Sequence, residues 1–173
     1  MESERLSLRP FAAEDLDKLH ALWTDPDVRR HLWDNRRLAR EETAAIIERS
    51  SRLYREESTG LWAVERRGVP GMIGFGGYWY FGEPQQLQIL FGLRPEHWGM
   101  GLATELARCL IHYGFETLGL ARVTGATDRA NVSSQRVMEK AGMRFVERVR
   151  NRASDLMYYA IDRPEPEASA RDH

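Results

Sequence analysis

The fold is decided by the stretch Leu93-Arg94-Pro95-Glu96-His97-Trp98-Gly99-Met100-Gly101-Leu102-Ala103-Thr104-Glu105. The apolar run at 86–93 predicts a buried strand, and the apolar stripe that follows predicts a long helix over 99–118. The first turn of a helix has unpaired N–H groups and the positive end of the helix dipole, which together attract anions. Glycine at 99 and 101 leaves room for a phosphate close to that backbone. The stretch therefore predicts a strand–turn–helix that binds a phosphorylated cofactor.

Neither of two well-known phosphate loops accounts for this turn. A dinucleotide-binding fingerprint requires a third glycine where this chain has Thr104, and a Walker loop requires a lysine, which is absent here. A nucleotide-binding domain of another fold is therefore disfavoured. On its own, the Gly-x-Gly pair fits equally well with a tight turn that binds nothing, so the ligand has to be identified from other segments.

The rest of the chain predicts a single α/β domain. Strands are expected at 5–9, 61–66, 72–81, 86–93, 121–127, 143–150 and 154–161. Helices are expected at 16–23, 41–57, 99–118 and 131–141. The order β-α-α-β-β-β-α-β-α-β-β predicts a mixed, mostly antiparallel central sheet with helices on both faces. A crevice should open beside the strand that leads to Gly99, where parallel and antiparallel parts meet.

Domain limits and composition narrow the class of protein further. We expect one domain over 1–162 and a disordered, polar tail over 163–173. The formal net charge of −1 argues against a nucleic-acid partner. Cys109 is the only cysteine, so no disulfide or metal site is expected, and a packed thiol is favoured over a nucleophile. The chain lacks an apolar run that could span a membrane and an evident signal peptide, so a cytoplasmic location without a membrane partner is the default expectation.

A second helix start follows the glycine turn, in Asn131-Val132-Ser133-Ser134-Gln135-Arg136-Val137-Met138-Glu139-Lys140-Ala141-Gly142-Met143. The simplest interpretation makes Asn131 an N-cap and Ser134 a small packing residue. The alternative is that both side chains bind the amide and thiol end of the cofactor whose phosphate lies on the turn.

Together these motifs resemble the GCN5-related N-acetyltransferase (GNAT) family, in particular its ribosomal-protein-alanine acetyltransferases. The matching segments are Leu8-Arg9-Pro10, Gly74-Phe75, Trp98–Glu105, Asn131, Ser134 and Val137–Met143. Their order and spacing cover nearly the whole chain. The resemblance implies the GNAT fold and transfer of an acetyl group from acetyl-CoA to a primary amine, in a small molecule or at a protein N-terminus. A homodimer is an option, because dimers are common among similar proteins.

The resemblance also implies a set of residues that bind acetyl-CoA. They are Phe91, Leu93, Trp98, Gly99, Met100, Gly101, Leu102, Ala103, Thr104, Asn131 and Ser134. The pyrophosphate would bind backbone N–H groups from about Gly99 to Thr104. The backbone of Phe91 and Leu93 would pair with the pantetheine arm, and the N–H of Leu93 would hold the oxyanion that develops on the thioester.

The catalytic positions depart from the family pattern. Met138 stands where many members have a tyrosine as general acid, so Ser134 is the candidate acid, acting directly or through water. Gln88 stands where relatives often have a glutamate, which leaves the general base unassigned. The remaining candidates, each with a simpler structural role, are Glu83, Glu105, His97 and Asp128. A water chain without a dedicated base is one alternative, and a non-catalytic acyl-CoA sensor or interaction module on the same fold is another.

The acceptor amine is expected between the first two helices and the middle strands. This region contains Arg29, Arg30, His31, Trp33, Arg36, Arg37 and Arg40, with Tyr78, Trp79 and Tyr80 opposite. Five arginines against Asp34 would attract an acidic acceptor, although a solvated helix–loop face is the favoured interpretation. The sequence does not name the acceptor.

Overall fold

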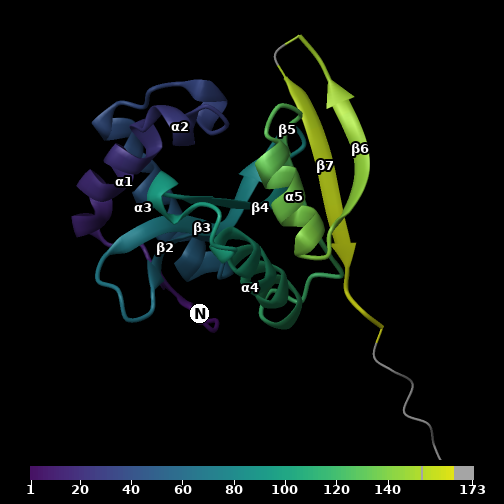
Figure 1. Ribbon diagram of the computed structural model, residues 1–173, viewed down its shortest axis with the longest axis horizontal. Coiled ribbons are helices and arrows are strands. Elements are labelled where there is room, and N and C mark those ends of the chain that lie inside the picture. Colours follow the sequence, from purple (N-terminus) through teal and green to yellow (C-terminus); the bar gives the residue numbers. More distant parts are fainter. Residues whose placement is uncertain (153, 166–173) are drawn as a thin grey trace, which may run out of the picture.

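Two antiparallel sheets lie side by side in the computed structural model, which describes residues 1–152 and 154–165 (Figure 1). The strands are β1 (Leu6–Pro10), β2 (Gly60–Arg66), β3 (Met72–Phe81), β4 (Gln86–Leu93), β5 (Arg122–Asp128), β6 (Arg144–Arg150) and β7 (Asp155–Asp162). The helices are α1 (Leu16–Thr24), α2 (Pro26–Arg29), α3 (Arg40–Glu57), α4 (Leu102–Glu116) and α5 (Val132–Lys140). Short 3-10 turns are η1 (Ala13–Asp15), η2 (Trp33–Asn35) and η3 (Pro95–His97).

The sheet separates between β4 and β5. The first sheet has the order β1-β2-β3-β4 and the second has the order β5-β7-β6. The Thr124 hydroxyl donates to the carbonyl of Leu87 at 3.2 Å, and Gly125 lies against Ile89, so the two strands start in contact and run in the same direction. They share no ladder in the described chain, and further along they border a cavity. The expected crevice thus lies between β4 and β5, the neighbouring strands of the described residues that run parallel.

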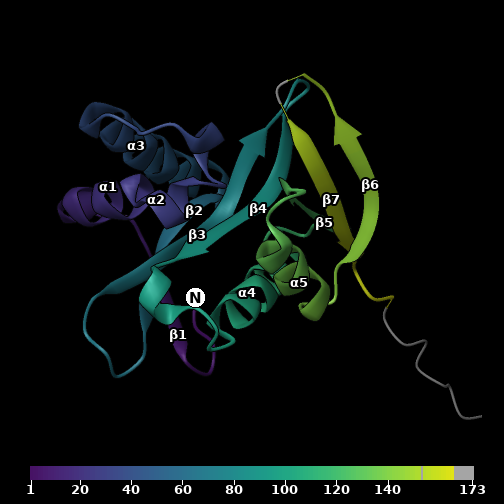
Figure 2. The ribbon, with the colours of Figure 1, turned by 45° about the horizontal axis from the view of Figure 1, so that its top comes forward.

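Helices cover both faces of the first sheet, as predicted (Figures 1 and 2). On one side, α1 and α3 pack on the sheet through a cluster that includes Trp23, Leu53 and Phe75. On the other side, Leu106 and Leu110 of α4 belong to the second cluster. The arrangement matches the predicted α/β class, with α5 placed beside α4 and the second sheet.

The structure differs from the sequence predictions most clearly at the start of α4 and directly after α1. Helix α4 begins at Leu102 rather than Gly99, because Gly99 and Gly101 have φ angles of +72° and +76°, outside the right-handed helical region. Pro26 follows α1 and begins α2, a short helix that is absent from the predicted elements, since the Asp25 side chain accepts the N–H groups of Asp27 and Val28. Residues 166–173 of the predicted tail lie outside the described chain. Within the described ranges, no helix combines the length and apolar character needed to cross a membrane.

Candidate active site

The first turn of α4 presents free backbone donors to open space. The first bond of the helix runs from the N–H of Glu105 to the carbonyl of Gly101, at 3.1 Å. The preceding N–H groups at 102–104 therefore have no helical partner, and no side chain of the described residues caps them. A Cβ built at Gly99 would contact nothing within 4 Å, and one built at Gly101 would meet only the Arg5 guanidinium at 3.6 Å. The turn has both the donors and the room that an anion requires.

A network from the N-terminus holds this turn in place. The Glu105 carboxylate accepts bonds from the Ser3 hydroxyl at 2.7 Å, from the Arg5 backbone N–H at 2.7 Å and from Arg5 Nε at 2.6 Å. Arg5 Nη1 in turn donates to the carbonyl of Met100 at 3.0 Å. Burial alone would raise the pKa of Glu105, but these bonds outweigh it and keep the pKa below its ordinary value. Glu105 therefore braces the turn as a carboxylate.

The open edge of β4 faces the second sheet. The N–H of Arg94 donates to Ile73 on β3 at 2.8 Å, and the β3–β4 register has no shift. Backbone groups of successive residues alternate between the two edges of a strand. The N–H groups of Phe91 and Leu93 therefore point away from β3. The Leu93 carbonyl accepts the indole N–H of Trp98 at 2.8 Å, which leaves the Leu93 N–H as a free donor at this edge.

The start of α5 shows that Asn131 is an N-cap. Its side-chain oxygen accepts the N–H of Ser134 at 3.2 Å, so the simplest interpretation of Asn131 is confirmed. The cap uses only Oδ1, and the Nδ2 group is still available as a donor. Ser134 is half-buried in the first turn, and Met138 lies one turn further on, 1% exposed in the core. A thioether cannot donate a proton, so Met138 provides no general acid.

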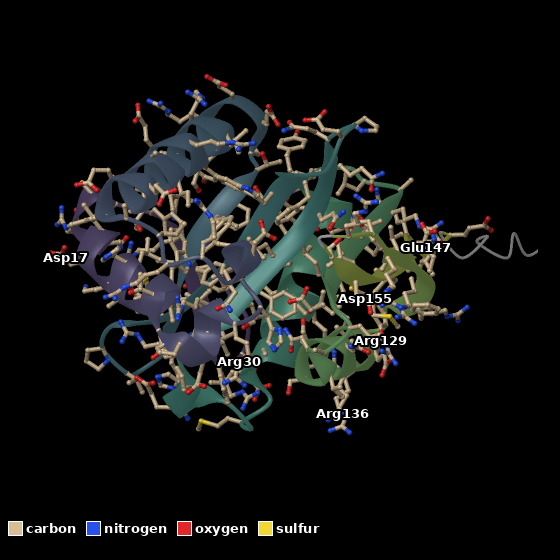
Figure 3. The ribbon with its side chains drawn as sticks, turned by 90° about the horizontal axis from the view of Figure 1, so that it is seen from above. Asp17, Arg30, Arg129, Arg136, Glu147 and Asp155 are labelled. Carbon is tan, nitrogen blue, oxygen red and sulfur yellow. The ribbon has the colours of Figure 1, made fainter. Side chains whose placement is uncertain are left out.

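A cavity of about 650 Å³ joins these elements. It is bordered by the end of β4, the glycine turn, the start of α4 and the first two turns of α5. On the opposite side it is bordered by Asp27, Val28, Arg30, His31, Leu32 and Phe75. Figure 3 labels Arg30 beside α2 and Arg136 on α5, which border the cavity from different elements. Ten of the eleven residues expected to bind the cofactor line this cavity, and Met100, whose carbonyl bonds Arg5, does not.

The family follows from comparison with known proteins. Residues 5–144 match the family described as the acetyltransferase (GNAT) domain. The chain belongs to the GNAT family. Acetyl-CoA, the acetyl donor of GNAT acetyltransferases, is its co-substrate, and the free donors and the unpaired strand edge described above fit that molecule. The narrower resemblance to ribosomal-protein-alanine acetyltransferases stays a prediction.

Relatives of this GNAT protein share its length and fold. The chain is 29% identical over 143 residues to the uncharacterized N-acetyltransferase YoaA of Bacillus subtilis (strain 168), and this alignment covers 82% of the chain and 81% of YoaA. The acetyltransferase structure from Agrobacterium tumefaciens str. C58 is 21% identical, covers 94% of both chains and has a TM-score of 0.81. The structure of AAC(6')-Ib in complex with paromomycin and acetyl-CoA is 20% identical, covers 92% of this chain and 94% of that one, and has a TM-score of 0.74.

Only part of the predicted acceptor region borders the cavity of this GNAT domain. Of the residues expected there, Arg30 and His31 line the cavity. Carboxylates neutralise three of the five arginines: Arg30 pairs with Asp27, Arg36 with Glu42 and Arg40 with Asp17. These pairs favour the solvated-face interpretation over an acidic acceptor.

The aromatic residues expected opposite this region do not border the cavity. Tyr78 is fully buried and its hydroxyl donates to the carbonyl of Leu110 at 2.7 Å. Trp79 is 4% exposed, under the guanidinium of Arg49 at 4.5 Å. The Tyr80 hydroxyl donates to Glu57. All three side chains stabilise the packing between strands and helices, and none of the three is among the residues that border the cavity.

The remaining candidate general bases of this GNAT domain lie at different places relative to the cavity. Glu83 is exposed in the β3–β4 turn, at the end of β4 remote from Leu93. His97 is in η3 and borders the cavity. Asp128, the last residue of β5, bonds to His31 at 3.1 Å. The two residues are 97 positions apart and no local sequence pattern connects them, so the sequence did not predict this pair.

Cys109 has the character expected of a packed thiol. It is half-buried in α4, and burial raises the pKa of its thiol above the ordinary value. A nucleophilic cysteine needs the opposite shift, because the thiolate is the reactive form. Cys109 therefore has a packing role, and it is not among the residues that border the cavity.

Proposed function

We propose that the protein transfers the acetyl group of acetyl-CoA to a primary amine, of a small molecule or a protein N-terminus, by direct attack on the thioester. The observation that carries this proposal is the single cavity that connects the free N–H groups of α4, the open edge of β4 and the α2 side. Donor and acceptor can thus meet without a covalent enzyme intermediate. The homodimer and the cytoplasmic location expected from the sequence stay predictions of this proposal.

The donor half of the cavity supplies binding groups in the order that the cofactor requires. The N–H groups at 102–104 and the space beside Gly99 would bind the pyrophosphate. The outward backbone groups of Phe91 and Leu93 would pair with the pantetheine arm as an added strand. The Nδ2 group of Asn131 is a donor for the same arm. Bound acetyl-CoA supplies a thioester, which is an acyl group activated for attack.

Two groups of this chain would assist the chemistry. The Leu93 N–H would donate to the thioester oxygen as negative charge develops on it. The Ser134 hydroxyl would pass a proton to the departing sulfur, directly or through water. Because Met138 cannot donate a proton, Ser134 is the hydroxyl of the α5 start that we assign to this role.

Calorimetry and a thiol-release assay test the proposal. Calorimetry with CoA and acetyl-CoA should give micromolar affinity, and ATP or NAD should not compete. Acetyl transfer is then measured with spermidine, kanamycin and a peptide with a free N-terminal alanine. Turnover with one of these amines supports the enzyme. Binding of acetyl-CoA without turnover on any of them supports the non-catalytic sensor instead, and absence of binding contradicts both.

A further inference from the structure

A hydrogen-bonded histidine–aspartate pair crosses the open end of the split sheet. His31 follows α2, and Asp128 ends β5, so the pair connects the α2 side to the second sheet. Nδ1 of His31 is 3.1 Å from Oδ2 of Asp128. The imidazole is 24% exposed and the carboxylate 41%, which leaves both in reach of water and of a small substrate. His31 also lines the cavity together with Phe91 and Leu93.

The carboxylate fixes which nitrogen of His31 can act as a base. A carboxylate accepts hydrogen bonds and does not donate them, so the hydrogen of a neutral imidazole lies on Nδ1. The lone pair is then on Nε2. None of the described residues hydrogen-bonds to Nε2. The pair therefore presents an unoccupied basic nitrogen on a side chain that borders the cavity.

We propose that His31 is the general base of the transfer reaction and that Asp128 is its positioning residue. The proposal rests on the function proposed above. The amine nitrogen forms a bond to the acetyl carbon while Nε2 of His31 takes one of its protons. The bond between that carbon and the sulfur breaks, and its electron pair leaves with the sulfur. The imidazolium then releases its proton, and the sulfur gains one, so that an amide and a free thiol result.

Other ionisable groups at the cavity are less suited to this role. On α2 and just after it, Asp27 is engaged by Arg30 at 3.4 Å. On α5, Arg136 and Lys140 border the cavity as cations. His97 on η3 is the second histidine that borders it, but no carboxylate of the described residues bonds its ring. His97 is therefore the matched control for His31.

The test compares the wild-type protein with H31N, D128N and H97N. Asparagine at 31 can still donate to Asp128 but has no basic nitrogen. We expect H31N to lower kcat about 100-fold, the size of a general-base contribution, while the Kd for CoA stays within about twofold. The pH profile of H31N should show only the steady rise that deprotonation of the amine near pH 10 causes, without the additional inflection of a titrating base that the wild type should show. D128N should lower kcat by a smaller factor than H31N and leave the Kd for CoA within about twofold, since the imidazole keeps its basic nitrogen but loses the partner that fixes its tautomer and orientation.

The outcomes separate this inference from the proposed function. H97N should keep the inflection of the wild-type pH profile, because His31 is intact in this variant. Wild-type turnover combined with an unchanged kcat and pH profile in H31N would overturn the inference alone. An unchanged kcat in D128N would show that Asp128 does not position His31. A wild-type protein that binds acetyl-CoA but acetylates none of the three amines would overturn the proposed function and the inference together.

Discussion

At the scale of single residues, Gly101 shows how a backbone angle prepares a binding site. Its φ of +76° ends the turn and lets α4 begin with free donors at 102–104. A side chain there would meet only the end of Arg5, so the requirement for glycine is conformational rather than steric. The conformation and the anion site therefore depend on the same residue.

G101A should lower both stability and CoA affinity. The left-handed conformation costs an alanine about 1 kcal/mol, and relaxation of the turn would misdirect its N–H groups. G68A is a matched control, since Gly68 has the same φ of +76° and nothing within 4 Å of a built Cβ, but lies in the β2–β3 turn. It should lower the melting temperature similarly and leave affinity unchanged. Equal affinities of G101A and the wild type would argue against phosphate binding at this turn.

The Glu105 carboxyl gives a second residue-scale prediction. Its pKa in the folded protein is below the ordinary glutamate value of 4.5, so the carboxylate stabilises the fold at neutral pH and loses this contribution as pH falls through the folded pKa. E105Q should therefore melt at a lower temperature than the wild type at pH 7. The gap should narrow below about pH 4.5. A difference in melting temperature between E105Q and the wild type that stays constant from pH 7 to pH 3 would show that the substitution acts through side-chain packing and not through charge.

At the scale of elements, α5 combines a structural and a binding role at Asn131. N131A removes the cap and should cost about 1 kcal/mol. N131D keeps the capping oxygen but loses the Nδ2 donor, so it should melt like the wild type and bind CoA more weakly. Calorimetry and thermal melts of both variants measure the two roles separately. If N131D binds CoA as tightly as the wild type, Asn131 is a cap and nothing more.

At the scale of the whole molecule, the sequence predicts features that follow from local patterns but not contacts between residues far apart in the chain. Hydrophobic periodicity and glycine placement predicted the order of strands and helices along the chain, because these depend on neighbouring residues, and that order in turn predicted helices on both faces and a crevice. The Arg5–Glu105 brace and the His31–Asp128 pair join residues 100 and 97 positions apart, and nothing in the local sequence connects them. The acceptor side was accordingly the least predictable part, and most of its expected arginines and aromatic residues lie away from the cavity.

The separation of the sheet has a consequence for amide hydrogen exchange. A sheet that opens in its middle has two additional edges, and here β4 and β5 present these edges to each other. The outward amides of Phe91 and Leu93 should exchange quickly in the free protein and slowly with CoA bound. The Gly92 amide points to β3 and should be protected in both states. If CoA instead slowed exchange equally at the amides of Phe91, Gly92 and Leu93, it would be stabilising the whole domain and not pairing with the open edge of β4.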